Sequence, residues 1–328
     1  MSAAKALAAA FALLLVHSAA AAAQRPHSAP IYEPLPDEKQ LRELALDTSE
    51  GAHLHYSLVP HGPSNILFAW GAVEYGGTEN FRTALDEAKV HEVWLFSPGG
   101  SMEDGMEIGR LVRARKLTTR VPNGAHCISA CNFILMGGLV RYVGTAATFE
   151  VHMFQNDAIT ERMREHIRQP PATLQDFIHT YPNWIKGRDQ DFATYRVICT
   201  RKPVEKPQVE AFHEFCAPGS EQPLQPTQLL PEFVKYMARS WQAERMKHGA
   251  PELGDDQLVP AFLAHEAIDE DVKDIQQQSA KVAAQVARFL TEMSVSLRFL
   301  TEFANIPNDV PRPLSREELR RMNIVNVD

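Results

Sequence analysis

Three short segments of the sequence carry residues whose types suit acyl transfer. Gly99 and Gly100 form a glycine pair, Ser129 stands among small residues, and His152 lies in an apolar stretch. A serine hydroxyl becomes a nucleophile when a histidine takes its proton. Backbone N–H groups can stabilise the oxyanion that forms on the attacked carbonyl. The three segments together hold the residue types that a serine-type catalytic site needs.

The glycine pair belongs to residues 97–101, Ser-Pro-Gly-Gly-Ser, between an apolar stretch at 92–96 and a helical pattern at 101–116. Glycine adopts backbone conformations that other residues avoid, so the main chain can approach a ligand closely. The N–H groups of Gly99 and Gly100, next to a helix N-terminus, are candidate oxyanion donors. The alternative interpretation is a tight turn without a functional role.

The serine lies in residues 124–131, Gly-Ala-His-Cys-Ile-Ser-Ala-Cys, which lead into a helix. A serine at a strand-to-helix turn resembles an exposed nucleophile, and the N–H of Ala130 is a candidate second oxyanion donor. The alternative is that Ser129 is only the N-cap of the helix, which is a frequent role of serine.

The histidine lies in residues 148–154, Thr-Phe-Glu-Val-His-Met-Phe. Side chains alternate between the two faces of a strand, so Phe149, Val151 and Met153 share one face and His152 lies on the other. His152 is then either a general base or a structural histidine.

Apolar patterns place these segments in an alternation of strands and helices. We expect strands at 65–73, 92–96, 117–121, 141–143 and 148–154, and helices at 78–89, 101–116, 129–136 and 269–303. A Ser-x-x-Glu pattern at Ser315 predicts another helix, followed by a strand at 323–327. This order favours an α/β fold in which a mostly parallel sheet is covered by helices.

The chain divides into five parts. Residues 1–23 have the order of a secretory signal, with Lys5, an apolar run at 6–16 and Ala21-Ala22-Ala23. Residues 24–63 form a proline-containing linker and N-terminal segment. Residues 64–157 and 268–328 form the two parts of the α/β core. Residues 158–267, rich in proline and charge without the strand–helix alternation, are expected to form a mostly helical insertion.

The composition, the net charge and the secretory signal at 1–23 (the leader) indicate which classes of protein fit the sequence. The 328 residues are 45% hydrophobic and 23% charged, which is ordinary for a globular protein, and the net charge of −8 gives no electrostatic case for nucleic-acid binding. The leader predicts a periplasmic or secreted protein, or a membrane-anchored one if the signal is not cleaved.

The four cysteines are candidates for disulfides, for zinc ligands or for buried small residues. In an oxidising compartment Cys199 and Cys216 are expected to form a disulfide, whereas with His213 they offer only three irregularly spaced zinc ligands. Cys127 and Cys131 either form a second bridge or are two buried small residues. We expect no metal site.

The combination of the Ser-Pro-Gly-Gly turn, Ser129 and His152 resembles the Clp protease proteolytic-subunit (ClpP-like) family. The resemblance covers about 66–154 and returns in the C-terminal helix and tail. It implies a crotonase-like spiral of β-β-α units. It also implies Ser129 as nucleophile, His152 as general base, Gly100 (with Gly99 beside it) and Ala130 as oxyanion donors, and Asp309 as the acid of the triad.

The resemblance and the leader together predict an exported serine hydrolase, a peptidase for peptides or unfolded segments that uses no cofactor. A Clp-type ATPase partner is not expected because those unfoldases need cytoplasmic ATP, and the family allows a homo-oligomer. Two alternatives remain open. One is a non-catalytic binding or scaffold protein of the cell envelope, favoured by the insertion and by the displaced position of Asp309; the other is acyl hydrolysis of a non-peptide substrate.

Overall fold

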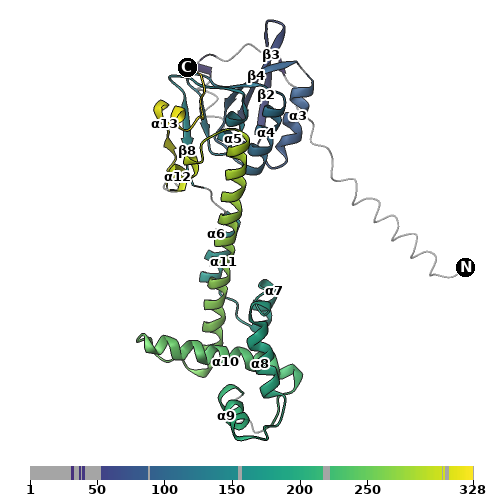
Figure 1. Cartoon of the computed structure of the whole chain (residues 1–328), viewed down its shortest axis with the longest axis vertical. Coiled ribbons are helices and arrows are strands. Elements are labelled where there is room, and N and C mark those ends of the chain that lie inside the picture. The colour runs from purple at the N-terminus through teal and green to yellow at the C-terminus, as the bar shows by residue number, and fades with distance from the viewer. Residues whose placement is uncertain are drawn as a thin grey trace, which may run out of the picture. The chain divides into compact units, whose positions relative to one another are not determined.

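The computed structural model describes residues 31–32, 37, 39–40, 53–87, 89–153, 157–216, 222–304, 306 and 310–327. The predicted leader at 1–23 and the predicted acid Asp309 lie outside the described residues. The chain forms two compact units (Figure 1). One comprises Met1–Phe154 and Ala284–Asp328, and the other comprises Gln155–Ala283.

The first unit is built on a six-stranded sheet. Its spatial order is β1 (Ile31–Tyr32), β2 (Leu54–His61), β3 (Ser64–Gly71), β4 (Val90–Phe96), β5 (Thr118–Val121) and β7 (Val140–Val143). β2 and β3 form an antiparallel hairpin, and all other neighbours are parallel. Residues 66–69 of β3 are all buried, as is typical of a strand covered on both faces.

A second, three-stranded sheet lies beside the first. Its order is β6 (His126–Ile128), β8 (Thr148–Val151) and β9 (Arg312–Pro313), with β6 and β8 parallel. A bridge between Ser97 and Cys127 joins the end of β4 to this sheet. The chain therefore passes from β5 to β6 to a helix, and then from β7 to β8. Each repeat of two strands places one strand in each sheet.

Three helices accompany these strands: α3 (Gly77–Asp86), α4 (Met102–Ala114) and α5 (Cys131–Gly137). Ser101 caps α4, since its Oγ accepts a hydrogen bond from Asp104 N at 3.2 Å. α4 and α5 touch through glycines, because a Cβ on Gly137 would collide with the Gly109 carbonyl. The expected α/β architecture is confirmed by these two sheets and their helices.

The second unit contains only helices among its described elements. They are α6 (Asp157–Arg168), α7 (Leu174–Thr180), η1 (Lys186–Arg188), α8 (Asp189–Cys199), α9 (Lys206–Phe215), α10 (Pro226–Lys247) and most of α11 (Asp255–Glu292). Phe177, Trp184 and Phe262 belong to one buried cluster, and Tyr195 and Phe233 to another. Each cluster buries large aromatic side chains, which contribute strongly to the energetics of a core.

Two predictions near the C-terminus are wrong. The helix expected at 269–303 ends at Glu292, because Ser294 has φ 56° and closes a Schellman motif in which Val295 N bonds to Leu290 O. α12 (Arg298–Ala304) is a separate helix.

The strand expected at 323–327 is absent from the described residues, because a left-handed residue again stands at this place. Asn323, with φ 55°, ends α13 (Arg316–Arg321) by a second Schellman motif, and the buried Ile324 and Val325 follow without strand pairing. The predicted capping box of α13, between Ser315 and Glu318, is present. None of the described helices combines the length and apolar character needed to cross a bilayer.

Candidate active site

Ser129 lies in the turn between β6 and α5 with a left-handed backbone, φ 56°. This conformation costs a non-glycine residue about 1–3 kcal/mol and persists only where the surroundings impose it. The N-cap residue of α5 is Ala130, without any side-chain capping bond, so the N-cap interpretation of Ser129 is wrong. The helix expected from 129 starts at Cys131 for the same reason, and the half-buried serine hydroxyl is not used in capping.

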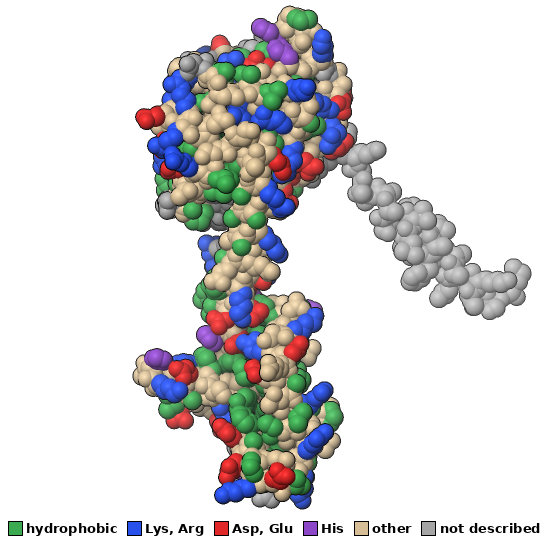
Figure 2. All heavy atoms as spheres, in the orientation of Figure 1, with side chains coloured by type: hydrophobic (Ala, Val, Ile, Leu, Met, Phe, Trp, Pro, Cys, Tyr) green, Lys and Arg blue, Asp and Glu red, His purple; other side chains and the backbone are tan. Residues whose placement is uncertain are grey.

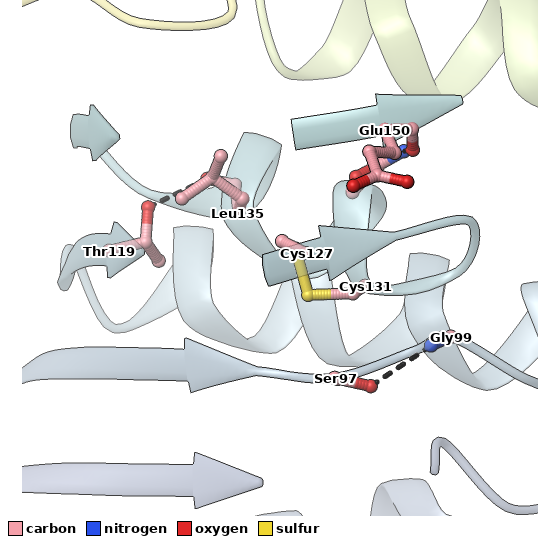
Figure 3. The surroundings of a disulfide bond; sticks show 8 residues. Ser97, Gly99, Thr119, Cys127, Cys131, Leu135 and Glu150 are labelled. Atoms are coloured by element: carbon pink, nitrogen blue, oxygen red, sulfur yellow. Dashed lines mark hydrogen bonds between the residues drawn. A yellow bond between two sulfur atoms is a disulfide. The ribbon is translucent and has the colours of Figure 1, made fainter. Parts of the chain in front are cut away.

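Two sets of interactions hold this turn. Cys127 and Cys131 form a disulfide across it, with their Cα atoms 5.3 Å apart (Figure 3). The carbonyl of Glu150 on β8 accepts hydrogen bonds from Ser129 N at 3.3 Å and from Asn132 Nδ2 at 2.7 Å. The disulfide thus joins the two ends of the turn, and the hydrogen bonds attach the turn to the neighbouring strand.

The glycine turn packs directly against Ser129. Gly99 has φ 99°, and a Cβ on it would lie 2.7 Å from both Ser129 Cβ and Ile128 O. Only glycine fits there, for conformational and steric reasons together. The Gly99 N–H donates to Ser97 Oγ at 3.1 Å (Figure 3), and Ser97 is fully buried.

Two N–H groups beside Ser129 remain unused. Within the described residues, neither Gly100 N–H nor Ala130 N–H donates a hydrogen bond to the protein. Of the two candidate glycine donors, Gly99 donates its N–H to Ser97 Oγ, so Gly100 stays the candidate. Gly99 instead lets the main chain approach Ser129, while Gly100 and Ala130 keep donors available to a ligand.

His152 follows the last residue of β8. Phe149 and Val151 are buried on one face, whereas Glu150 and His152 are half-buried on the other. The alternation expected for this strand stops at Val151, and Met153 is 37% exposed. The Nδ1 atom of His152 lies 2.9 Å from the Met153 carbonyl oxygen. A carbonyl only accepts hydrogen bonds, so Nδ1 is the donor here, and in the neutral ring Nε2 is then the acceptor.

The register of β6 and β8 brings Ser129 and His152 to the same end of the small sheet. Ile128 pairs with Glu150, so Ser129 is one residue beyond this pair and His152 is two residues beyond it. No hydrogen bond joins Ser129 Oγ to the His152 ring in the part of the chain described. Hydrogen bonds of this type are often long without a bound substrate.

Two further titratable residues share the face of His152, and sequence reasoning did not assign either of them. Glu150 precedes His152 by two residues, and His126 on β6 pairs with Thr148. The pKa of His126 is lowered by burial, partly offset by the charge of Glu150, and its ring packs against Phe96 at a centroid distance of 4.5 Å. Strand alternation over 126–128 is the sequence signal that would have placed His126 on this face.

All four cysteines are paired, Cys127 with Cys131 and Cys199 with Cys216. The predicted Cys199–Cys216 disulfide is confirmed, and a zinc site with thiolates from these two residues is excluded. Of the two interpretations left open for Cys127 and Cys131, the structure shows the bridge. Two disulfides indicate an oxidising, extracytoplasmic environment.

Among the described residues one group has metal-ligand geometry: His265, Glu266 and Asp269 on α11. Glu266 there accepts a hydrogen bond from Trp184 Nε1 at 2.6 Å and pairs with Arg188, so its carboxylate is used within the fold.

No family model matches the sequence, and no curated protein matches it. Among solved structures, a mutant of the 1510-N membrane-bound stomatin-specific protease is 14% identical, covering 30% of this chain and 57% of its own, with a TM-score of 0.23. An enoyl-CoA hydratase from Shewanella pealeana is 10% identical, covering 35% and 53%, with a TM-score of 0.23. A methylmalonyl CoA decarboxylase is 10% identical, covering 70% and 97%, with a TM-score of 0.25.

The chain spans little more than half the length of the protease and of the Shewanella hydratase. With TM-scores of this size, these similarities do not decide the function.

Proposed function

We propose that this chain is a serine hydrolase with a Clp-protease-like, crotonase-type core. Ser129 is the nucleophile, His152 the general base, and the N–H groups of Gly100 and Ala130 form the oxyanion hole. The observation that carries the proposal is the left-handed Ser129 packed against the Gly99–Gly100 turn, with two unused N–H donors beside it. The passage of the chain between two sheets in β-β-α order supports the crotonase-type assignment.

The reaction follows from these groups. Ser129 Oγ attacks the acyl carbon of the substrate, and its proton passes to His152 Nε2. The carbonyl oxygen becomes an oxyanion and accepts hydrogen bonds from Gly100 and Ala130. The proton on His152 then passes to the leaving group. A water molecule next attacks the acyl carbon and gives a proton to His152 Nε2, which returns it to Ser129 Oγ as the acid product leaves.

The orientation of His152 has a contributor besides an acid. The Met153 carbonyl accepts a hydrogen bond from Nδ1–H and so favours the tautomer that a general base needs. Asp309 remains the proposed acid and would stabilise the imidazolium. Because the carbonyl already orients the ring, loss of Asp309 costs less activity than loss of His152.

The proposed substrates are peptides or unfolded segments, taken up without a Clp-type ATPase and without a cofactor. The protein is proposed to be exported by the leader at 1–23, or anchored by it if it is not cleaved, and to act as a homo-oligomer. A non-peptide acyl substrate would use the same oxyanion hole, so hydrolysis of peptide and ester substrates has to be compared.

A fluorophosphonate probe tests the assignment. The unmodified protein should be labelled on Ser129, and Ser129→Ala should abolish the labelling. Ser294→Ala is the matched control, since Ser294 has the same φ of 56° but ends α11; it should label normally. Labelling that persists in Ser129→Ala, or is absent from the folded unmodified protein, contradicts the hydrolase.

A second candidate is a non-catalytic binding protein with the same core. The observation that favours it is the missing hydrogen bond between Ser129 and His152 in the described residues. Absence of labelling, together with saturable binding of an unfolded polypeptide measured by fluorescence anisotropy, would support this candidate.

A further inference from the structure

The Cys127–Cys131 disulfide encloses the residues on which the proposed reaction depends. Cys127 belongs to β6, Cys131 is the first residue of α5, and Ser129 and Ala130 lie between them. Four residues of extended chain span about 13 Å, whereas the Cα atoms of this pair are 5.3 Å apart. The disulfide therefore closes a sharp reversal whose middle residue is the left-handed serine.

Each end of the disulfide is fixed by a different contact. At the Cys127 end, Ser97 N bonds to His126 O at 3.0 Å and Ile128 N to Ser97 O at 3.1 Å, which ties the strand to the residues before the glycine turn. At the Cys131 end, the neighbouring Asn132 donates to the Glu150 carbonyl at 2.7 Å. Both sulfur-bearing residues are completely buried.

We propose that Cys127 and Cys131 are a positioning pair for Ser129, so that the site is competent only when their disulfide is closed. The inference rests on the proposed function. The closed bridge holds the unfavourable φ of Ser129 and keeps the Ala130 N–H beside the glycine turn. With the bridge open, residues 128–130 relax toward ordinary backbone conformations and the hydroxyl leaves its position relative to Gly100 and His152. Activity then begins when the chain meets an oxidising compartment.

The second disulfide provides a matched control. Cys199 and Cys216 bridge two helices of the other unit, with a Cα separation of 5.6 Å, and both are also buried. The chain has four cysteines, so the Cys199→Ala/Cys216→Ala variant retains Cys127 and Cys131 alone. Removing either bridge deletes the same kind of bond, but only one of them spans the proposed nucleophile.

The test measures how fast a fluorophosphonate modifies Ser129 in the full chain. Ser129 Oγ bonds to phosphorus, the P–F bond breaks, fluoride leaves, and the proton passes to His152. Cys127→Ala/Cys131→Ala should lower the limiting modification rate about 100-fold, the scale expected when a reacting group is displaced by about 1 Å, with little change in apparent affinity for the probe. Cys199→Ala/Cys216→Ala should stay within about twofold of the unmodified protein, because its Ser129 turn is intact.

A redox titration of the Cys199→Ala/Cys216→Ala variant tests the proposal without changing any residue of the turn. Dithiothreitol donates two electrons, the Cys127–Cys131 bond becomes two thiols, and the reagent becomes its cyclic disulfide. The modification rate should fall as the thiols appear and return after oxidation by glutathione disulfide, with the far-UV circular dichroism unchanged.

The outcomes separate the two proposals. If the unmodified protein is not modified at Ser129, both are overturned. If it is modified, and the open or cysteine-free turn reacts at the same rate, only the positioning role is overturned. Loss of reactivity that coincides with loss of the circular dichroism signal makes the bridge a stability element and also overturns the positioning role.

Discussion

At the scale of single residues, the proposed reaction depends on which polar groups are already used. Gly99 N–H donates to Ser97 Oγ, whereas no described residue accepts a hydrogen bond from the N–H groups of Gly100 and Ala130. His152 Nδ1–H donates a hydrogen bond to the Met153 carbonyl, and in this tautomer Nε2 is the acceptor. The candidate site is therefore made by polar groups that form no hydrogen bond with another described residue: the N–H groups of Gly100 and Ala130, and His152 Nε2.

Ser129 and His152 should act as a unit. Residues that share one covalent step do not have additive effects, so Ser129→Ala, His152→Ala and the double variant should fall to a similar residual rate, while Asp309→Asn retains more activity. Hydrolysis of an activated ester measures this. If His152→Ala retains nearly full activity while Ser129→Ala has none, the base is a different residue.

His126 should make stability depend on pH. Burial lowers the pKa of His126 below its ordinary value of 6.5, so between these two pKa values the unfolded chain binds more protons than the folded one. Its contribution to stability is thus complete above pH 6.5 and declines as the pH falls. The free energy of unfolding, from urea titrations at pH 8 and pH 5.5, should fall less in His126→Phe than in the unmodified protein.

The comparison is between the two falls, because other groups of the protein also change protonation between these pH values. Equal falls in His126→Phe and in the unmodified protein would show that burial of His126 does not contribute to the pH dependence.

At the scale of elements, the position of Ser129 depends on how α5 is seated. α4 and α5 approach closely because Gly109 and Gly137 have no side chains at their contact. On the other side, the buried Arg141 donates to the carbonyls of Met136 and Met293, joining the end of α5 to the end of α11. A change in this packing would move the start of α5, where Cys131 holds the serine turn.

Gly137→Ala should therefore destabilise the first unit. The added Cβ meets the Gly109 carbonyl, and forced overpacking typically costs about 1–3 kcal/mol. Thermal unfolding followed by circular dichroism measures the loss. Gly187→Ala is the control, since a Cβ there meets nothing within 4 Å; a melting temperature of Gly137→Ala as high as that of this control would contradict the packing argument.

At the scale of the whole molecule, two units with separate cores share one chain. The first carries the candidate site, and the second has aromatic clusters and its own disulfide. On the face shown in Figure 2, basic and acidic side chains alternate over both units without forming one basic patch.

Removal of the Cys199–Cys216 bridge should destabilise the second unit. The two cysteines are 17 residues apart, and closing a loop of this size contributes about 3 kcal/mol in the chain-entropy model. Urea unfolding of Cys199→Ala/Cys216→Ala, followed by tryptophan fluorescence because Trp184 lies in this unit, measures the loss. An unfolding midpoint equal to that of the unmodified protein would contradict the stabilising role.

The sequence by itself determined the features that depend on neighbours along the chain. The caps at Ser101 and Ser315, the main strands and helices of the core, and the order of glycine turn, serine and histidine follow from residue type and local spacing. The two cysteines around Ser129 are close enough along the chain to suggest a bridge, although the sequence left a pair of buried thiols equally open.

Only the tertiary structure decided which groups are free to act. Ser97 Oγ accepts the hydrogen bond of the Gly99 N–H. The Glu150 carbonyl, on a different strand, accepts a hydrogen bond from the turn in which Ser129 is left-handed. The ends of α11 and α13 likewise depend on left-handed residues at Ser294 and Asn323 that no apolar pattern marks. The physical reason is that each donor and each unfavourable φ is settled by competition among contacts, many of them between residues distant in sequence, which residue type and spacing do not encode.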